Sequence, residues 1–188
     1  MFDPDGPVLG IDPGLSRCGY GAVLQRAGSA TPVASGVLRT PPGDPLPERL
    51  AALESDLVAL VEELHPCALA VERVLFQTNV RTAISVGQAS GIALAVAARA
   101  RVPVAHYSPN EVKLAVTGSG RADKPQVQAM VQRLLALSEV PPPDAADALA
   151  LALCHSWSHR SRTLAGDTPA GAGFEHAVAA ALAREGGA

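Results

Sequence analysis

Two short apolar runs that each end in a carboxylate limit the folds open to this chain more than any other feature. The first, residues 7–11, is followed by Asp12 and a Pro13-Gly14 turn. The second, residues 68–71, is apolar at every position and is followed by Glu72. A continuous apolar run of this length is typical of a strand that helices bury on both faces. The sequence therefore predicts an α/β sheet with two carboxylates at strand ends.

The other expected elements follow from hydrophobic periodicity and from the positions of Pro and Gly. They are three strands, at 19–25, 32–39 and 102–107, and five helices, at 46–64, 80–101, 109–116, 124–137 and from 144 to about 159. The first three strands are joined by short turns, which predicts an antiparallel meander. In the long helix Gly87, Gly91 and Ala95 are spaced by four; packing on the chain's own sheet is the favoured role, and close approach of a second backbone is the alternative.

Composition predicts one ordinary domain. The chain has 188 residues, of which 48% are hydrophobic, enough for a core. We expect this domain to span residues 1–160 and an Ala/Gly-rich, weakly ordered tail to span 161–188. Three widely spaced cysteines favour free thiols. The acidic N-terminus and an uncharged stretch at 82–98, too short for a bilayer, favour a cytoplasmic protein.

Charge is unevenly distributed along the chain. The net charge is −3, yet residues 73–133 contain eight basic side chains and only two acidic ones. A positive surface of this kind is what phosphate binding requires, although a solvated helix face would give the same count. Both lysines of the chain, Lys113 and Lys124, lie in this window.

Two further carboxylates, Asp144 and Asp147, are three residues apart on the last expected helix and so share one face. Alone, Asp12 could be an ordinary turn residue and Asp144 a helix cap. Four converging carboxylates would repel one another unless a cation neutralised them, and a set of oxygen ligands without His or Cys favours Mg²⁺ or Mn²⁺. Two such ions about 4 Å apart support hydrolysis of a phosphodiester. His155 lies too far along the helix to join them, so we interpret it and His159 as structural or surface residues.

Four segments together resemble the RuvC family, the bacterial Holliday-junction resolvases: residues 10–14, the strand ending at Glu72, residues 118–124 and residues 143–150. The resemblance runs in order from about residue 7 to 158. It implies a ribonuclease H-like fold with a mixed five-stranded sheet flanked by helices. It also implies a homodimeric, Mg²⁺-dependent endonuclease of recombination and repair, with the RuvA–RuvB branch-migration complex as a partner.

By position, the family's metal-binding and catalytic carboxylates correspond to Asp12, Glu72, Asp144 and Asp147. Its basic residues near the cut phosphate correspond to Lys113 and Lys124. With the basic window, these give the expected nucleic-acid contacts Phe76, Arg81, Lys113, Arg121 and Lys124. One departure is that the family usually has an aromatic residue where this chain has Leu75, with Phe76 one place later; an aromatic here would stack on unpaired bases.

Three other functions remain open from the residues alone. An actin-like ATPase or sugar kinase also begins with a Gly-Ile-Asp-x-Gly strand, but needs a second glycine-rich turn and a second lobe that this chain lacks. A protein that binds junctions without cutting them would not need the full carboxylate set. A nuclease of the same fold that acts on RNA cannot be distinguished by charge, because both backbones are polyanions.

Overall fold

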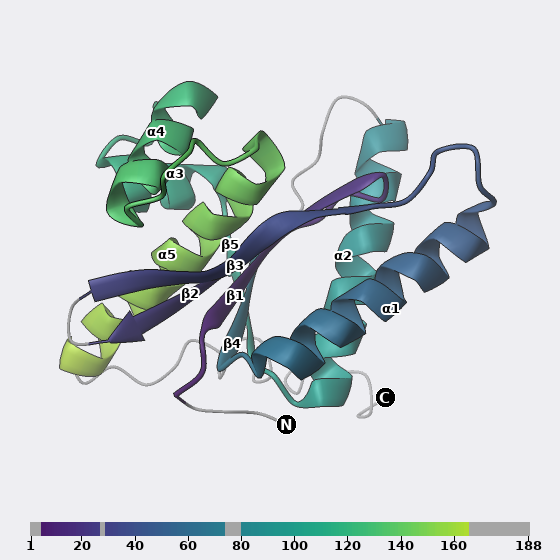
Figure 1. Ribbon diagram of the computed structural model, residues 1–188, viewed down its shortest axis with the longest axis horizontal. Coiled ribbons are helices and arrows are strands. Elements are labelled where there is room, and N and C mark those ends of the chain that lie inside the picture. The colour runs from purple at the N-terminus through teal and green to yellow at the C-terminus, as the bar shows by residue number, and fades with distance from the viewer. Residues whose placement is uncertain (1–4, 27–28, 74–79, 166–188) are drawn as a thin grey trace, which may run out of the picture. The chain divides into compact units, whose positions relative to one another are not determined.

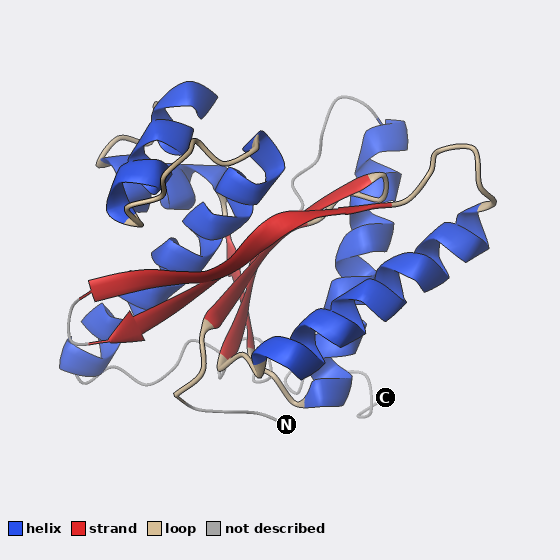
Figure 2. Ribbon diagram, in the orientation of Figure 1, coloured by secondary structure: helices blue, strands red, loops and turns tan. Residues whose placement is uncertain are grey.

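The computed structural model describes residues 5–26, 29–73 and 80–165 (Figure 1). Its strands are β1 (Val8–Asp12), β2 (Arg17–Arg26), β3 (Ser29–Arg39), β4 (Ala68–Glu72) and β5 (Val104–Tyr107). Its helices are α1 (Leu46–Leu64), α2 (Val80–Ala100), α3 (Pro109–Thr117), α4 (Lys124–Leu134) and α5 (Pro143–Ala165). In these residues the strands form a mixed five-stranded sheet in the order β3-β2-β1-β4-β5, which confirms the predicted fold class (Figure 2).

The pairing of the central strands sets the position of the two strand-end carboxylates. β1 pairs antiparallel with β2 and parallel with β4, with Ile11 opposite Val71. The next residues in this register are Asp12 and Glu72. Because parallel neighbours end at the same edge of a sheet and opposite residues share a face, the two carboxylates lie side by side on one face.

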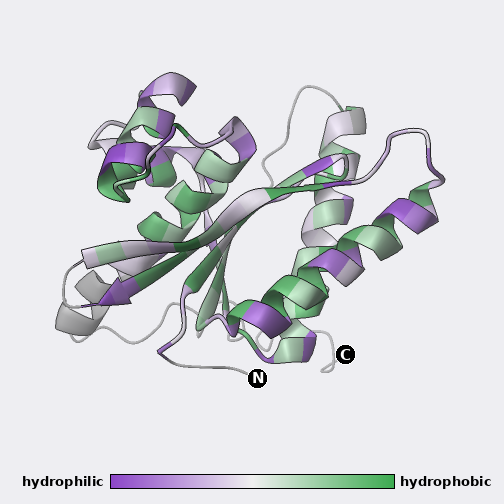
Figure 3. Ribbon diagram, in the orientation of Figure 1, coloured by the Kyte–Doolittle hydropathy of each residue, from purple (hydrophilic) through white to green (hydrophobic). Residues whose placement is uncertain are grey.

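One face of the sheet packs against α1 and α2, which lie on the same side in Figure 1. Figure 3 shows hydrophobic residues along β1 and β4 and alternating hydrophobic and hydrophilic bands on α1. The core on this face contains Leu9, Ile11, Leu69 and Val71 from the strands, Leu53, Leu57 and Val61 from α1, and Ala89, Ala93, Val96 and Ala97 from α2. Packing on this face forms the hydrophobic core with α1 and α2, whereas the side chains of Asp12 and Glu72 point to the opposite face of the sheet.

The small-residue stripe of α2 does not pack on the sheet, so the favoured sequence interpretation was wrong. Gly87, Gly91 and Ala95 are exposed, and an added Cβ at either glycine would meet open space. Residues two positions along the helix, including Ala89 and Ala93, occupy the core instead. By length and composition the segment Thr82–Ala100 could cross a membrane, but its inner face belongs to this core.

On the other face, α5 lies directly on the backbone of β1 and β2. A Cβ added to Gly10 would overlap the carbonyl oxygen of Ala148, and one added to Gly19 would overlap that of Asp144. At Gly21 it would lie 2.7 Å from Leu149 Cγ. In the register of the sheet, Gly10 pairs with Gly21 and Asp12 pairs with Gly19. The glycines thus form a trough that brings the start of α5 against the end of β1.

Most predicted elements are confirmed, with differences at their ends. The strands of the β2–β3 hairpin extend to Arg26 and Ser29, beyond the predicted 25 and 32. The helix predicted to reach 137 ends at Leu134, because Ala136 adopts a positive φ of 49°. The last helix continues to Ala165 rather than ending near 159. The chain divides into two compact units, Met1–Ser156 and Trp157–Ala188, and only residues 157–165 of the second are described.

Candidate active site

The four predicted carboxylates interact with one another at the carboxyl ends of β1 and β4. Glu72, Asp144 and Asp147 all act on Asp12 electrostatically, and Asp147 also acts on Glu72. The strands supply Asp12 and Glu72, whereas the first turns of α5 supply the other two. Two strand ends and one helix start, separated by up to 135 residues, therefore form one acidic cluster.

Asp12 is the most perturbed member of the acidic cluster. Burial, followed by the negative charges of Asp147, Glu72 and Asp144, raises its pKa from 3.8 to about 7. Burial also raises the pKa values of Glu72 and Asp147. A cluster in which several carboxyls hold their protons more tightly than usual is short of positive charge, and a bound cation would supply it.

Lys124 faces the acidic cluster from the start of α4. Asp123 caps this helix, since its side chain accepts a hydrogen bond from the Gln126 N–H at 2.9 Å. The following residue, Lys124, donates from Nζ to Asp147 Oδ2 at 3.3 Å. The Asp147 charge raises the pKa of Lys124, while Lys124 partly offsets the rise at Asp147. Lys124 thus places a positive charge beside the carboxylates.

Arg17 also contacts the acidic cluster, and the sequence analysis missed it. Its Nε donates to Asp144 Oδ2 at 2.6 Å, and its Nη2 lies 2.5 Å from the same oxygen. Arg17 is two residues before Gly19, which pairs with Asp12, so it lies on the same face of the sheet. The strand alternation could have identified it only once the β1–β2 register was known.

The other predicted nucleic-acid contacts divide into three groups. The positive charge of Lys113, on α3, partly offsets the raised pKa values of Glu72 and Asp147, so Lys113 lies within electrostatic reach of the acidic cluster. Arg121 is exposed in the turn before α4, where its backbone N–H donates a hydrogen bond to Ser119 Oγ. Phe76, with Leu75, lies outside the described residues, and so does the side chain of Arg81.

The donor set fits a hard divalent cation by its chemistry, because all four side chains offer carboxylate oxygens. As they stand, however, no three His, Cys, Asp or Glu side chains among the described residues are arranged as a metal-binding group. Asp144 and Asp147 pair instead with Arg17 and Lys124. His155 is not part of this set; its Nδ1 lies 2.8 Å from Tyr107 Oη, in keeping with the predicted structural role.

The sequence also has many close relatives. The family described as "Crossover junction endodeoxyribonuclease RuvC" matches residues 8–155. The enzyme of that name from Salinispora arenicola is 58% identical over 158 residues, which cover 83% of this chain and 90% of the relative. The one from Leifsonia xyli subsp. xyli is 55% identical over 80% of this chain and 73% of its own length.

Solved structures agree with this assignment. A structure described as T. thermophilus RuvC in complex with Holliday junction substrate superimposes with a TM-score of 0.79 at 38% identity, covering 84% of this chain and 97% of that one. The yeast mitochondrial Holliday junction resolvase Ydc2 has a TM-score of 0.57 at 18% identity and covers 82% of this chain and 80% of its own, which shows a shared fold alone. By sequence and structure, the chain belongs to the RuvC family of crossover junction endodeoxyribonucleases.

Proposed function

We propose that this chain resolves four-way DNA junctions by making paired, symmetric nicks, and that Mg²⁺, with Mn²⁺ as a substitute, serves the hydrolysis. The observation that carries the proposal is the acidic cluster, in which β1, β4 and α5 bring four carboxylates together beside Lys124. A relative whose structure contains a Holliday junction supports the choice of substrate. Membership of a nuclease family makes the ATPase alternative untenable.

Asp12, Glu72, Asp144 and Asp147 would hold the metal, expected as two ions per site. When bound, such ions activate a water and stabilise the leaving oxygen of a phosphodiester. The chain's own residues position the substrate: Lys124 and Lys113 supply positive charge where a phosphate must approach four carboxylates. Arg17 keeps Asp144 oriented toward the cluster.

A symmetric dimer would match the substrate, because a four-way junction has approximate two-fold symmetry and needs two like strands cut. The exposed face of α2 suits such a contact. Val80 and Ile84 are 70% and 56% exposed, and Gly87 and Gly91 leave open space for a second backbone. We therefore propose α2 as the dimer interface, a cytoplasmic location and, by family resemblance, RuvA–RuvB as a partner.

The test is incubation of a labelled synthetic junction with the protein and Mg²⁺, followed by denaturing electrophoresis. We expect the wild type to give paired nicks at symmetric positions that a ligase reseals. Asp144→Asn should bind the junction without cutting it, because it removes a ligand charge but keeps the shape. Lys124→Ala should cut at least about tenfold more slowly with little change in stability, since the side chain is 72% exposed.

Asp56→Asn is the matched control, because Asp56 is an exposed carboxylate on α1, across the sheet from the cluster. It should cut like the wild type. A wild type that binds junctions and never cuts them would favour the binding-only alternative. Preferred cutting of RNA duplexes would favour the RNA nuclease. Equal cutting by Asp144→Asn and wild type would remove the acidic cluster from the reaction.

A further inference from the structure

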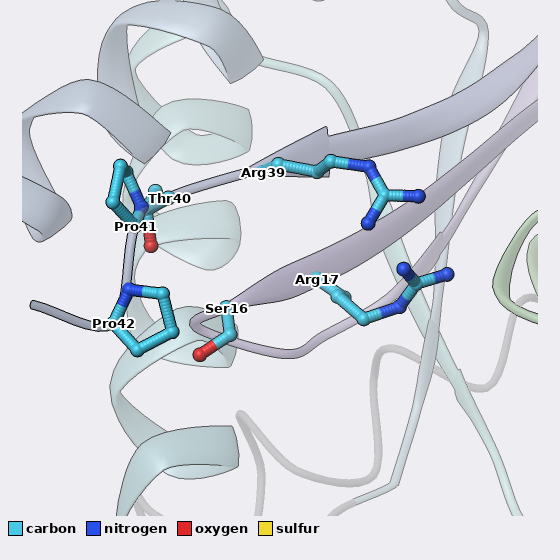
Figure 4. Close-up of a pocket in the computed structure, with 6 residues that line it drawn as sticks. All are labelled: Ser16, Arg17, Arg39, Thr40, Pro41 and Pro42. Atoms are coloured by element: carbon cyan, nitrogen blue, oxygen red, sulfur yellow. The ribbon is translucent and has the colours of Figure 1, made fainter.

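A second basic group lies next to the acidic cluster, where β2 begins and β3 ends. Arg17 and Arg39 face each other directly across these antiparallel strands. Figure 4 shows their side chains extending in the same direction from the two neighbouring strands. They border a surface pocket of about 390 Å³ that is lined by Ser16, Arg17, Arg39, Thr40, Pro41 and Pro42.

The placement of these two arginines is unfavourable for the sheet alone. Like charges directly opposite each other on neighbouring strands repel and destabilise the pair. Asp144 neutralises part of the Arg17 charge. Arg39 is exposed, and the ion pairs found in the described part of the chain do not include it. An anion held between the two guanidinium groups would convert the repulsion into attraction.

On the side of the pocket next to α1, hydrogen bonds from Arg49 hold two of the lining residues. Arg49, on α1, donates from Nη2 to Ser16 Oγ at 2.7 Å and from Nε to Thr40 Oγ1 at 3.1 Å. Thr40 is 3% exposed, and its hydroxyl donates to the Leu15 carbonyl oxygen at 2.5 Å. These bonds join the β1–β2 turn to the end of β3. The Ser16–Thr40 side of the pocket is therefore held in place before any ligand arrives, which lowers part of the entropic cost of binding.

The chemistry of the pocket favours a phosphate on a polymer. Arginine forks match the oxygens of phosphate or carboxylate groups. All the lining residues except Thr40 are exposed, so the pocket does not enclose a small molecule. Arg17 contacts the acidic cluster as well, so an anion in the pocket lies close to the reaction centre. A nucleic-acid backbone presents phosphates at short, regular intervals, and contacts to such phosphates fix its register.

We propose that Arg17 and Arg39 bind a backbone phosphate that is not cleaved, and so hold one arm of the substrate on the β2–β3 side of the acidic cluster. The inference rests on the proposed function, because it takes a nucleic acid as the substrate. It adds a contact from outside the basic window at residues 73–133. Arg49 is then a positioning residue that orients Ser16 and Thr40.

The test measures binding of a fluorescent junction at salt concentrations from about 0.05 to 0.3 M, with Glu72→Gln as the parent protein so that cutting does not interfere. The slope of log K against log [salt] is negative, and the loss of one phosphate contact makes it less steep by about 1. We expect Arg39→Ala to show this change and to bind about three- to tenfold more weakly near 0.1 M salt. Arg39→Lys should keep the slope and lose only part of the affinity, because it retains a charge without the fork.

Arg26→Ala is the matched control, since Arg26 is an exposed arginine at the opposite end of β2. It should keep the parent's slope. An Arg39→Ala slope equal to that of Arg26→Ala would overturn the proposal, and so would a lower melting temperature with an unchanged slope. Cutting is scored separately on the wild type, so a protein that binds junctions without cutting would contradict the proposed function and still allow the pocket to be tested.

Discussion

Asp12 lies at the end of β1, where burial and three neighbouring carboxylates raise its pKa from 3.8 to about 7. The folded, metal-free protein therefore binds this proton more tightly than the unfolded chain does. Between about pH 4 and pH 7 the unfolded chain has lost the proton while the folded protein keeps it, so stability falls as the pH rises. Glu72 and Asp147 act in the same direction, because their pKa values are also raised.

The fall of stability with rising pH gives a prediction for Asp12→Asn, in which an amide of similar shape replaces the carboxyl and cannot ionise. In EDTA at pH 8 the variant should be more stable than the wild type, by on the order of 4 kcal/mol at most, since one pKa unit corresponds to about 1.4 kcal/mol. Near pH 4 the two should be equal. Urea unfolding at several pH values measures the difference, with Asp56→Asn as a control on the exposed surface. Lower stability of Asp12→Asn at pH 8 would contradict the raised pKa.

Individual site residues differ in how far the sequence reveals them. Asp12 and Glu72 are identified by the pattern of a buried strand followed by a carboxylate, and Asp144 and Asp147 by their spacing on a helix. Lys124 is indicated by its unfavourable place in the first turn of a helix. Arg17 is not identified, because its partner Asp144 is 127 residues away and only the docking of α5 brings them together.

At the scale of elements, the site depends on how α5 packs on the sheet. Gly10 and Gly21 remove the side chains that would otherwise separate α5 from β1 and β2. Local periodicity predicts the helix and both strands, but it does not show that the missing Cβ atoms form a trough. In the same way, it predicts α2 and assigns the wrong stripe to its buried face. Both facts depend on contacts between segments that are distant in sequence.

Gly10→Ala tests this packing. The new methyl group would overlap the Ala148 carbonyl, so α5 or β1 must shift, and we expect a loss of about 3 kcal/mol in the free energy of unfolding. Cutting should fall further than the folded fraction, because the shift also moves Asp147. Gly43→Ala is the control, since a Cβ there meets open space. Urea unfolding and the junction assay provide the two readouts; equal stability of the two variants would rule out a tight contact.

At the scale of the whole molecule, the exposed side of α2 is an apolar surface separate from the acidic cluster. The core side of α2 packs with α1, while Ile84 on its outer side is 56% exposed. A pairing of two α2 helices would bury this apolar surface and give the assembly two acidic clusters related by symmetry. The resemblance predicted a dimer, and the exposed stripe indicates which helix would form it.

Ile84→Glu should separate the proposed dimer, because it places a charge on the exposed apolar face of α2. We expect the molar mass from light scattering to halve and paired nicks to become independent single nicks. Val140→Glu is a matched control, since Val140 is also 56% exposed but lies in the loop before α5. A wild type that is monomeric at all concentrations, or an Ile84→Glu variant that remains dimeric, would contradict the assignment.

The glycine trough beneath α5 also has a consequence for synthesis. The last strand of the sheet ends at Tyr107 and α5 begins at Pro143, so a ribosome makes all five strands before the helix that completes the acidic cluster. Until α5 docks over Gly10 and Gly19, only Asp12 and Glu72 of the acidic cluster can be in place on the sheet. Without α5 this face of the sheet also loses its cover, since Ala146, Leu149 and Leu153 are buried there. If the acidic cluster is the cutting centre, as proposed, a chain still being translated should have no nuclease activity until α5 docks.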